Sequence, residues 1–111
     1  MQKRLFCFAV NVIRILRRLK DSPDIQSVKY QLTKSSGSAG ANYEEAQAAE
    51  SRADFGHKVN ISLKEMRESN YWLRILQAVF PDNKDLSALI TESHELSLIL
   101  GSICFKVRKP D

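Results

Sequence analysis

The sequence has few residues that break or turn a helix. It contains four glycines and three prolines among 111 residues, about half the combined share of roughly 12% that is usual in proteins. A β-sandwich or β-barrel needs a turn about every 8 to 12 residues, and this chain has too few breakers to supply them. Uninterrupted apolar runs are also short, so we expect no membrane span. The composition therefore favours a single all-α domain covering residues 1–111.

Groups that usually carry out catalysis or bind metals are scarce as well. The chain has two histidines and two cysteines, and it lacks a CxxC pair, a phosphate-binding glycine loop, a GxSxG elbow and an HExxH motif. A di-iron site in a helical bundle needs two Glu-x-x-His motifs. This chain offers one imperfect version, from Asp54 to His57. We therefore expect no metal, no cofactor and no catalytic residue, and a protein that is not an enzyme.

Acidic residues are absent from the first 20 positions, although the chain contains 13 of them. Positive charge is instead concentrated at the two ends of a chain whose formal net charge is +4. Clusters of lysine and arginine are typical of surfaces that contact phosphates. The candidate nucleic-acid-binding residues are therefore Lys3, Arg4, Arg14, Arg17, Arg18, Lys106, Arg108 and Lys109.

The N-terminal segment superficially resembles a signal peptide, because Lys3 and Arg4 precede an apolar run. Arginines interrupt that run, and no cleavage site of the small-x-small type follows it. The two cysteines are also placed as expected for a reducing compartment, far apart and outside any paired motif. The sequence therefore predicts a cytoplasmic protein.

Apolar residues recur every three or four positions through most of the chain, which predicts amphipathic helices. Ser51 and Asp54 resemble a capping box, Pro81 stops a helix, and Asp82 or Asn83 can cap the next one. The helices are predicted to cover about residues 3–20, 24–50, 52–80 and 83–107.

Short connections make consecutive helices antiparallel neighbours, so the predicted fold is an up-down-up-down four-helix bundle. This topology also predicts that the first and last cations meet at one basic end, with Cys7 and Cys104 near it. The apolar face of the first helix covers about half of its circumference, which is wider than packing on one neighbour requires. We therefore expect this helix to contact another subunit as well.

Residues 35–41 contain nothing larger than serine or alanine, which is compatible with either a flexible linker or a closely packed helix. We favour the helix, because Tyr30 and Tyr43 continue the helical pattern on both sides. Polar residues in this segment follow one another at helical spacing, and a lysine beyond the next turn can meet the last of them. We expect Asn42, Glu45 and Lys58 to form a buried, mutually satisfied group. The predicted polar seam consists of Gln31, Ser35, Ser38, Asn42, Glu45 and Lys58.

Aromatic residues beside arginines offer a second place where nucleic acid could bind. Tyr71 and Trp72 lie next to Arg67 and Arg74, and such a group can stack on bases. We favour the alternative that Trp72 packs between helices, because aromatic residues at helical spacing are usually buried.

The stretch from Lys34 to Leu76 resembles the signature of bacterial proteins encoded within intervening sequences of 23S rRNA genes, which are sometimes labelled ribosomal proteins. The resemblance covers essentially the whole chain and is densest over residues 38–46 and 55–76. Lys34 departs from it, standing where an arginine is more usual. Positions that match the family pattern are Ser35, Ser38, Gly40, Ala41, Asn42, Glu45, Lys58, Lys64, Glu65, Glu68, Tyr71, Trp72 and Leu73.

The resemblance implies a homopentameric ring of four-helix bundles without enzymatic activity. A related branch serves as the accessory protein of diversity-generating retroelements, so the resemblance also implies binding to RNA or DNA and, as a further partner, a reverse transcriptase. The alternative from a different class is an oligomeric scaffold or adaptor that recruits a protein partner without binding nucleic acid. A third, weaker hypothesis places the first helix on an anionic membrane surface.

Overall fold

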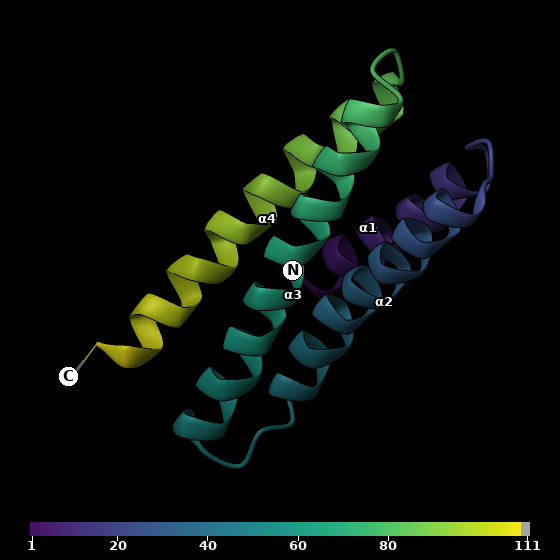
Figure 1. Ribbon diagram of the computed structural model, residues 1–111. Helices are drawn as coiled ribbons and strands as arrows, with labels where there is room; N and C mark the ends of the chain where they lie inside the picture. Colours follow the sequence, from purple (N-terminus) through teal and green to yellow (C-terminus); the bar gives the residue numbers. More distant parts are fainter. Residues whose placement is uncertain (110–111) are drawn as a thin grey trace.

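The computed structural model describes residues 1–109, which form four α-helices. Successive helices run antiparallel and pack into a rod with extents of 49 × 21 × 19 Å (Figure 1). The predicted all-α architecture is therefore confirmed. The helices are α1 (Gln2–Leu16), α2 (Pro23–Ala46), α3 (Arg52–Val79) and α4 (Lys84–Arg108).

α3 and α4 begin where the sequence places capping residues. The Ser51 hydroxyl accepts a hydrogen bond from the Asp54 backbone N–H at 3.0 Å, and this fixes the start of α3. The Asn83 side chain accepts from the Leu86 N–H at 3.0 Å in the same way. Each cap satisfies one of the backbone donors that the first turn of a helix leaves unpaired.

Two helices end earlier than predicted. α1 ends at Leu16, and the turn that follows buries Leu19, whose backbone carbonyl accepts from Lys29 Nζ at 3.0 Å. A helix that continued to residue 20 could not form this turn, so α1 ends before Leu19. α2 ends at Ala46 because residues 47–50 carry no large apolar side chain that could pack on the bundle.

α1 is much shorter than its neighbours. Its 15 residues span about 22 Å, whereas the 28 residues of α3 span about 42 Å. Leu5 packs over Gly40, where an added Cβ would lie 3.6 Å from the Leu5 Cβ, so α1 begins beside α2 well before α2 ends. Figure 1 accordingly shows the N-terminus part-way along the rod and the C-terminus beyond it. One end of the bundle therefore consists of α2, α3 and α4 alone.

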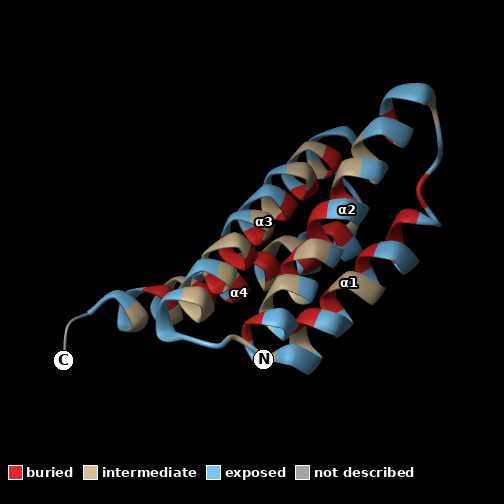
Figure 2. Cartoon of the chain, turned by 90° about the horizontal axis from the view of Figure 1, so that it is seen from below, coloured by how far each residue is buried: buried red, intermediate tan, exposed pale blue. Residues whose placement is uncertain are grey.

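The core lies along the inner faces of the helices, as the colours of Figure 2 show. The alternating spacing of three and four predicts a buried seam from Phe55 to Phe80 on α3 and from Leu86 to Val107 on α4. Both seams are buried along their middle, whereas their ends, at Phe55, Phe80, Ile103 and Val107, are only partly buried, and Cys104 is buried beside Ile103. The buried seam residues are Val59, Ser62, Met66, Ser69, Leu73 and Leu76 on α3, and Leu86, Leu89, Ser93, Leu96 and Leu100 on α4.

The run of small residues belongs to α2 and packs closely, so the linker alternative is wrong. The buried hydroxyls of Ser35 and Ser69 lie 2.8 Å apart and share a hydrogen bond between α2 and α3. The buried Ser62 hydroxyl donates to the Ala39 carbonyl at 2.6 Å across the same contact. Small side chains let the two backbones approach, and the serines satisfy one another inside the contact.

Within residues 1–109, α4 alone is long and apolar enough to cross a membrane by length and composition. Its leucines at positions 86, 89, 96 and 100 are buried against the other helices. Core helices of soluble bundles meet the same criterion. Burial of these leucines accounts for part of the apolar character of α4, while Leu98 and Phe105 on the same helix are exposed.

Candidate functional site

The fold separates the two groups of cations that were expected to form one basic end. Arg4 lies against α4, where its Nε and Nη2 each donate to the Glu92 carboxylate at 2.8 Å, and Nη2 also lies 2.8 Å from Glu95 Oε1. Arg108 is 13 residues beyond Glu95, which is about 20 Å along the helix. The predicted single basic end is wrong, because α1 begins beside the middle of α4.

Arg4 holds α1 on α4. The hydrogen bonds from its guanidinium lower the pKa of the Glu92 carboxyl, and the two carboxylates raise the pKa of Arg4 further. A bidentate arginine–carboxylate contact fixes orientation as well as charge. Arg4 is therefore engaged within the bundle rather than available to a phosphate.

The other predicted cations of the N-terminal segment lie on the outer surface of α1 and of the turn that follows it. Lys3, Arg14 and Arg17 are exposed, and Arg18 is exposed with its Nη1 3.8 Å from the Asp85 carboxylate of α4. At such a distance and exposure the Arg18–Asp85 interaction is weak. The outer face of α1 thus keeps most of its positive charge.

A second group of cations gathers where α3 begins and α4 ends. Arg52 donates from Nε to the Val107 carbonyl at 3.0 Å, and from Nη2 to the carbonyls of Lys106 at 3.0 Å and Lys109 at 3.2 Å. These carbonyls belong to the last turn of α4, which favours cations. Lys106, Arg108 and Lys109 are exposed. We call Arg52, Lys106, Arg108 and Lys109 the C-terminal basic cluster.

The three cations that α4 contributes to this cluster have no carboxylate partner within the described part of the chain. No ion pair joins Lys106, Arg108 or Lys109 to an acidic residue among positions 1–109, and Asp111 lies outside the described residues. Sequence reasoning missed Arg52. The available signal was the antiparallel pairing of α3 and α4, which places the first residue of α3 beside the last turn of α4.

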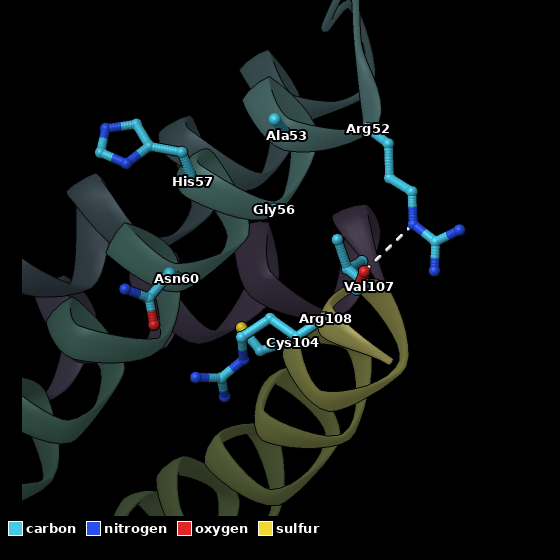
Figure 3. Close-up of a pocket in the computed structure, with 8 residues that line it drawn as sticks. All are labelled: Arg52, Ala53, Gly56, His57, Asn60, Cys104, Val107 and Arg108. Atoms are coloured by element: carbon cyan, nitrogen blue, oxygen red, sulfur yellow. Dashed lines mark hydrogen bonds between the residues drawn. The ribbon is translucent and has the colours of Figure 1, made fainter. Parts of the chain in front are cut away.

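A cavity of about 570 Å³ opens between α3 and α4 next to the C-terminal basic cluster (Figure 3). Gly56 allows the two helices to approach there, since a Cβ at this position would lie 2.8 Å from Val107 Cγ1. The Cys104 side chain is buried, and this burial raises the pKa of its thiol. A thiol with a raised pKa is a weak nucleophile.

The polar seam differs from its predicted arrangement. Asn42 Nδ2 donates to the carbonyl and hydroxyl of Ser38, at 2.9 and 3.0 Å, within α2. Lys58 Nζ lies 3.8 Å from Glu45 Oε2, and the Glu45 side chain is 66% exposed. The expected buried group of three is therefore wrong, and Glu45 with Lys58 forms a surface ion pair. Ser35 is fully buried, whereas Gln31 and Ser38 are half-buried.

The seam is displaced because the inward face of α2 lies slightly further round the helix than the polar spacing indicated. The residues that point into the core there are Leu32, Ser36 and Ala39, together with Ser35. Of the predicted seam, only Ser35 coincides with this face.

The aromatic group on α3 is mostly structural. Trp72 packs against the core, and its Nε1 donates to the Glu68 carboxylate at 3.1 Å. Tyr71 meets Trp72 edge to face with ring centroids 5.2 Å apart, and the Arg74 guanidinium lies 5.7 Å from the Tyr71 ring centroid. The favoured interpretation of Trp72 as a packing residue is confirmed.

Within residues 1–109, no group of three or more histidine, cysteine, aspartate or glutamate side chains is arranged to hold a metal ion. The candidate binding features of the described surface are its exposed cations, its exposed apolar side chains and the cavity beside Arg52.

Comparisons with known proteins agree with this fold. Residues 1–102 match the family model described as 23S rRNA-intervening sequence protein. The chain is similar to a crystal structure of a protein with unknown function from the S23 ribosomal protein family of Bacteroides thetaiotaomicron, with a TM-score of 0.82 and 31% sequence identity. The match covers 93% of this chain and 96% of that one. A comparison with curated proteins finds no significant match.

Proposed function

Because the chain belongs to the 23S rRNA-intervening sequence protein family, we propose that it is a non-enzymatic protein that assembles into a ring and binds RNA or DNA through exposed cations. The observation that carries this proposal is the C-terminal basic cluster, in which the fold brings Arg52 of α3 to the three cations at the end of α4. Lys106, Arg108 and Lys109 are exposed and form no ion pair with an acidic residue among positions 1–109, so they can replace the counterions of a phosphate backbone.

The outer face of α1 supplies a second, separate set of phosphate contacts. Lys3, Arg14 and Arg17 are exposed there, and Arg18 is held only weakly by Asp85. Arg4 takes no part, because two carboxylates already surround it. In a ring, each subunit would repeat both surfaces, so modest positive charge per chain would add up to a strong field.

Ring formation is supported by an apolar strip on α1 that the bundle leaves uncovered. Phe6 is 63% exposed and Ile13 is 40% exposed, and they lie seven residues apart on one side of the helix. Val10 lies between them and is half-buried. A strip with this spacing suits packing against a helix of another subunit. We assign this strip, made of Phe6, Val10 and Ile13, to the contact between subunits.

Charge reversal tests the nucleic-acid proposal and locates the contacts. Replacing Lys106, Arg108 and Lys109 with glutamate changes the chain's formal charge from +4 to about −2. We expect the affinity for RNA, measured by fluorescence anisotropy, to fall by orders of magnitude.

The matched variant replaces Arg14, Arg17 and Arg18 with glutamate and makes the same change in charge on α1. We expect this variant to lose less affinity for RNA than the first one, but still a measurable amount. Circular dichroism should show that its helical content is unchanged. Binding that survives both reversals combined would overturn the electrostatic proposal.

A scaffold or adaptor is the second candidate function, and exposed apolar residues on α4 favour it. Leu98 is 62% exposed and Phe105 is 65% exposed. Such side chains suit a protein partner, which the family resemblance suggests is a reverse transcriptase. This candidate predicts no binding to RNA even at low salt, and a loss of partner capture when Leu98 and Phe105 are replaced with serine.

A further inference from the structure

The carboxylates of α4 all lie on the side that faces α1. Glu92 and Glu95 each lie 2.8 Å from the Arg4 guanidinium, and Asp85 lies 3.8 Å from Arg18. α4 contains no other acidic residue. The side of α4 that borders α3 therefore has no carboxylate.

That side of α4 exposes two large apolar side chains. Ser87 identifies it, because its hydroxyl donates to the side-chain oxygen of Gln77 on α3. Leu98 and Phe105 follow Ser87 by 11 and 18 residues, close to whole numbers of helical turns, so they lie on the same side. Both side chains are more than half exposed. Between them, a Cβ at Gly101 would meet nothing within 4 Å, so another helix can approach closely there.

α3 contributes cations to the same surface. Arg74 donates to Asn70, which in turn donates to Ser93 of α4, both at 2.9 Å, so these residues lie beside α4. Arg67 is exposed one heptad before Arg74, on the same side of α3. Neither arginine forms an ion pair with an acidic residue among positions 1–109. We call the surface that carries Arg67, Arg74, Leu98 and Phe105 the α3–α4 face.

The outward positions of α3 on this face carry no negative charge. Glu68 is exposed nearby, but its carboxylate accepts from Trp72 Nε1 at 3.1 Å, and Trp72 packs against the core. The outward positions between the cavity and Arg74 follow one another by four and three residues. They are Asn60, Lys64, Arg67, Tyr71 and Arg74.

The cavity of about 570 Å³ lies at one end of the α3–α4 face (Figure 3). Ala53 and Gly56 of α3 and Cys104 and Val107 of α4 line it with small or apolar side chains. Arg108 lines it as well, and no carboxylate does. Such a pocket suits one large apolar side chain of a partner.

Charge and polarity together select the occupant of this face. Nucleic acid would pair with the cations, but phosphate contacts do not cover side chains such as Leu98 and Phe105. The apolar strip on α1 of a second copy is also excluded, because Arg14 and Arg17 beside it would meet the cations of α3. An α-helix with an apolar stripe and an acidic flank complements both the strip on α4 and the cations on α3.

We propose that the α3–α4 face binds an amphipathic helix of a partner protein that carries aspartate or glutamate along one flank of its apolar stripe. Leu98 and Phe105 contact the apolar stripe, and Arg67 and Arg74 pair with carboxylates about one heptad apart. One large apolar side chain of the helix enters the cavity. The inference goes beyond nucleic-acid binding and ring formation, and it rests only on the second candidate function, recruitment of a protein partner.

A synthetic helix tests the face with a defined probe. The probe is a fluorescein-labelled peptide of about 20 residues, which spans about 30 Å as a helix, with leucines at helical spacing and glutamates on one flank. We expect it to bind the full chain, measured by fluorescence anisotropy, roughly tenfold more tightly than a peptide in which lysine replaces each glutamate. A scrambled peptide of the same composition should bind as weakly as the lysine peptide. No binding of the acidic helix, or equal binding of the scrambled peptide, would overturn the proposal.

Charge reversal on α3 tests the cationic side of the face. Arg67→Glu combined with Arg74→Glu should weaken the affinity for the acidic peptide roughly tenfold or more and strengthen that for the lysine peptide. Lys20→Glu combined with Lys84→Glu makes the same change in net charge at exposed positions outside the face and should leave both affinities nearly unchanged. Equal losses in the two double variants would overturn the proposal.

Serine substitution on α4 tests the apolar side. Leu98→Ser combined with Phe105→Ser should also weaken the affinity for the acidic peptide roughly tenfold or more. Val79→Ser, at an exposed apolar position at the end of α3, should leave it unchanged. If the Leu98 and Phe105 substitutions instead lower the mass of the assembly in light scattering, the face is a contact between copies and the proposal is overturned. Binding to phosphatidylserine vesicles that Arg67→Glu with Arg74→Glu abolishes would assign the face to a membrane and overturn it as well.

Failure of this proposal is distinguishable from failure of nucleic-acid binding. Wild-type protein that binds RNA but not the acidic peptide would remove the helix site and leave nucleic-acid binding in place. Protein that binds the acidic peptide but no RNA at low salt would remove nucleic-acid binding and leave the helix site in place.

Discussion

At the residue scale, two helical glycines meet different surroundings. A Cβ at Gly56 would lie 2.8 Å from Val107 Cγ1, whereas a Cβ at Gly37 would meet nothing within 4 Å. Neither glycine has a positive φ, so alanine fits the backbone at both sites. We expect Gly37→Ala to raise the free energy of unfolding by about 0.5 to 1 kcal/mol, because alanine restricts the unfolded chain.

Gly56→Ala should lower the free energy of unfolding by about 1 kcal/mol, because forcing α3 and α4 apart outweighs the same gain in helix propensity. Urea denaturation of the two variants measures both effects. Equal stabilisation by both substitutions would show that the contact between Gly56 and Val107 is loose.

Glu45 on α2 and Ser62 on α3 should differ in their contribution to the free energy of unfolding. The Glu45 side chain is 66% exposed and its ion pair with Lys58 is 3.8 Å long, so Glu45→Ala should cost less than about 1 kcal/mol. Ser62 is buried and donates to the Ala39 carbonyl at 2.6 Å, so Ser62→Ala should cost about 1 kcal/mol or more. If chemical denaturation ranks these two variants in the opposite order, the assignment of burial along this contact is wrong.

At the element scale, α1 is the helix whose attachment depends on pH. The pKa of Glu92 is lowered by its hydrogen bonds with Arg4. A lowered folded-state pKa stabilises the bundle above the ordinary glutamate value, here 4.5, and this stabilisation is lost as the pH falls through the lower folded value. We therefore expect amides of α1 to exchange faster relative to those of α3 as the solution is acidified below pH 4.5.

Glu92→Gln should loosen α1 at neutral pH, lower the Tm by a few degrees and remove much of this acid response. Glu44→Gln, at an exposed position of α2, is the matched control and should leave α1 protected. Hydrogen exchange followed by mass spectrometry measures the effect. Unchanged protection of α1 in Glu92→Gln would show that the apolar contacts of Leu5 and Phe8 are sufficient to hold it.

Most of the fold could be predicted from local signals, because caps and apolar periodicity act over a few residues. Ser51, Asn83 and the seams of α3 and α4 lie where the pattern placed them. The length of α1 depends on a tertiary event, the burial of Leu19 in the turn, which periodicity does not contain. The short α1 places Arg4 beside Glu92 in the middle of α4. The prediction of a single basic end was therefore wrong for the same reason. Arg52 was missed for a related reason, since it donates to backbone carbonyls of α4, which a pattern of charged side chains does not reveal.

At the scale of the whole molecule, the apolar strip of Phe6, Val10 and Ile13 predicts an assembly. Light scattering should report a mass near five times the 12.6 kDa of one chain at micromolar concentration. Ile13→Glu should shift the mass toward that of one chain, because a charge on the strip cannot be buried between subunits without a partner. Val79→Glu, at an exposed apolar position at the end of α3, is the control and should leave the assembly intact. A wild-type mass of 12.6 kDa would contradict ring formation.

The most direct test of the central claim is the affinity of the wild-type chain for RNA as a function of salt. Each phosphate contact releases counterions, so the logarithm of the affinity should fall linearly with the logarithm of the salt concentration, with a slope that reflects contacts from the C-terminal basic cluster and the outer face of α1. The account predicts tight binding at low salt and a steep negative slope. Affinity that does not change with salt, or no binding at low salt, would contradict it.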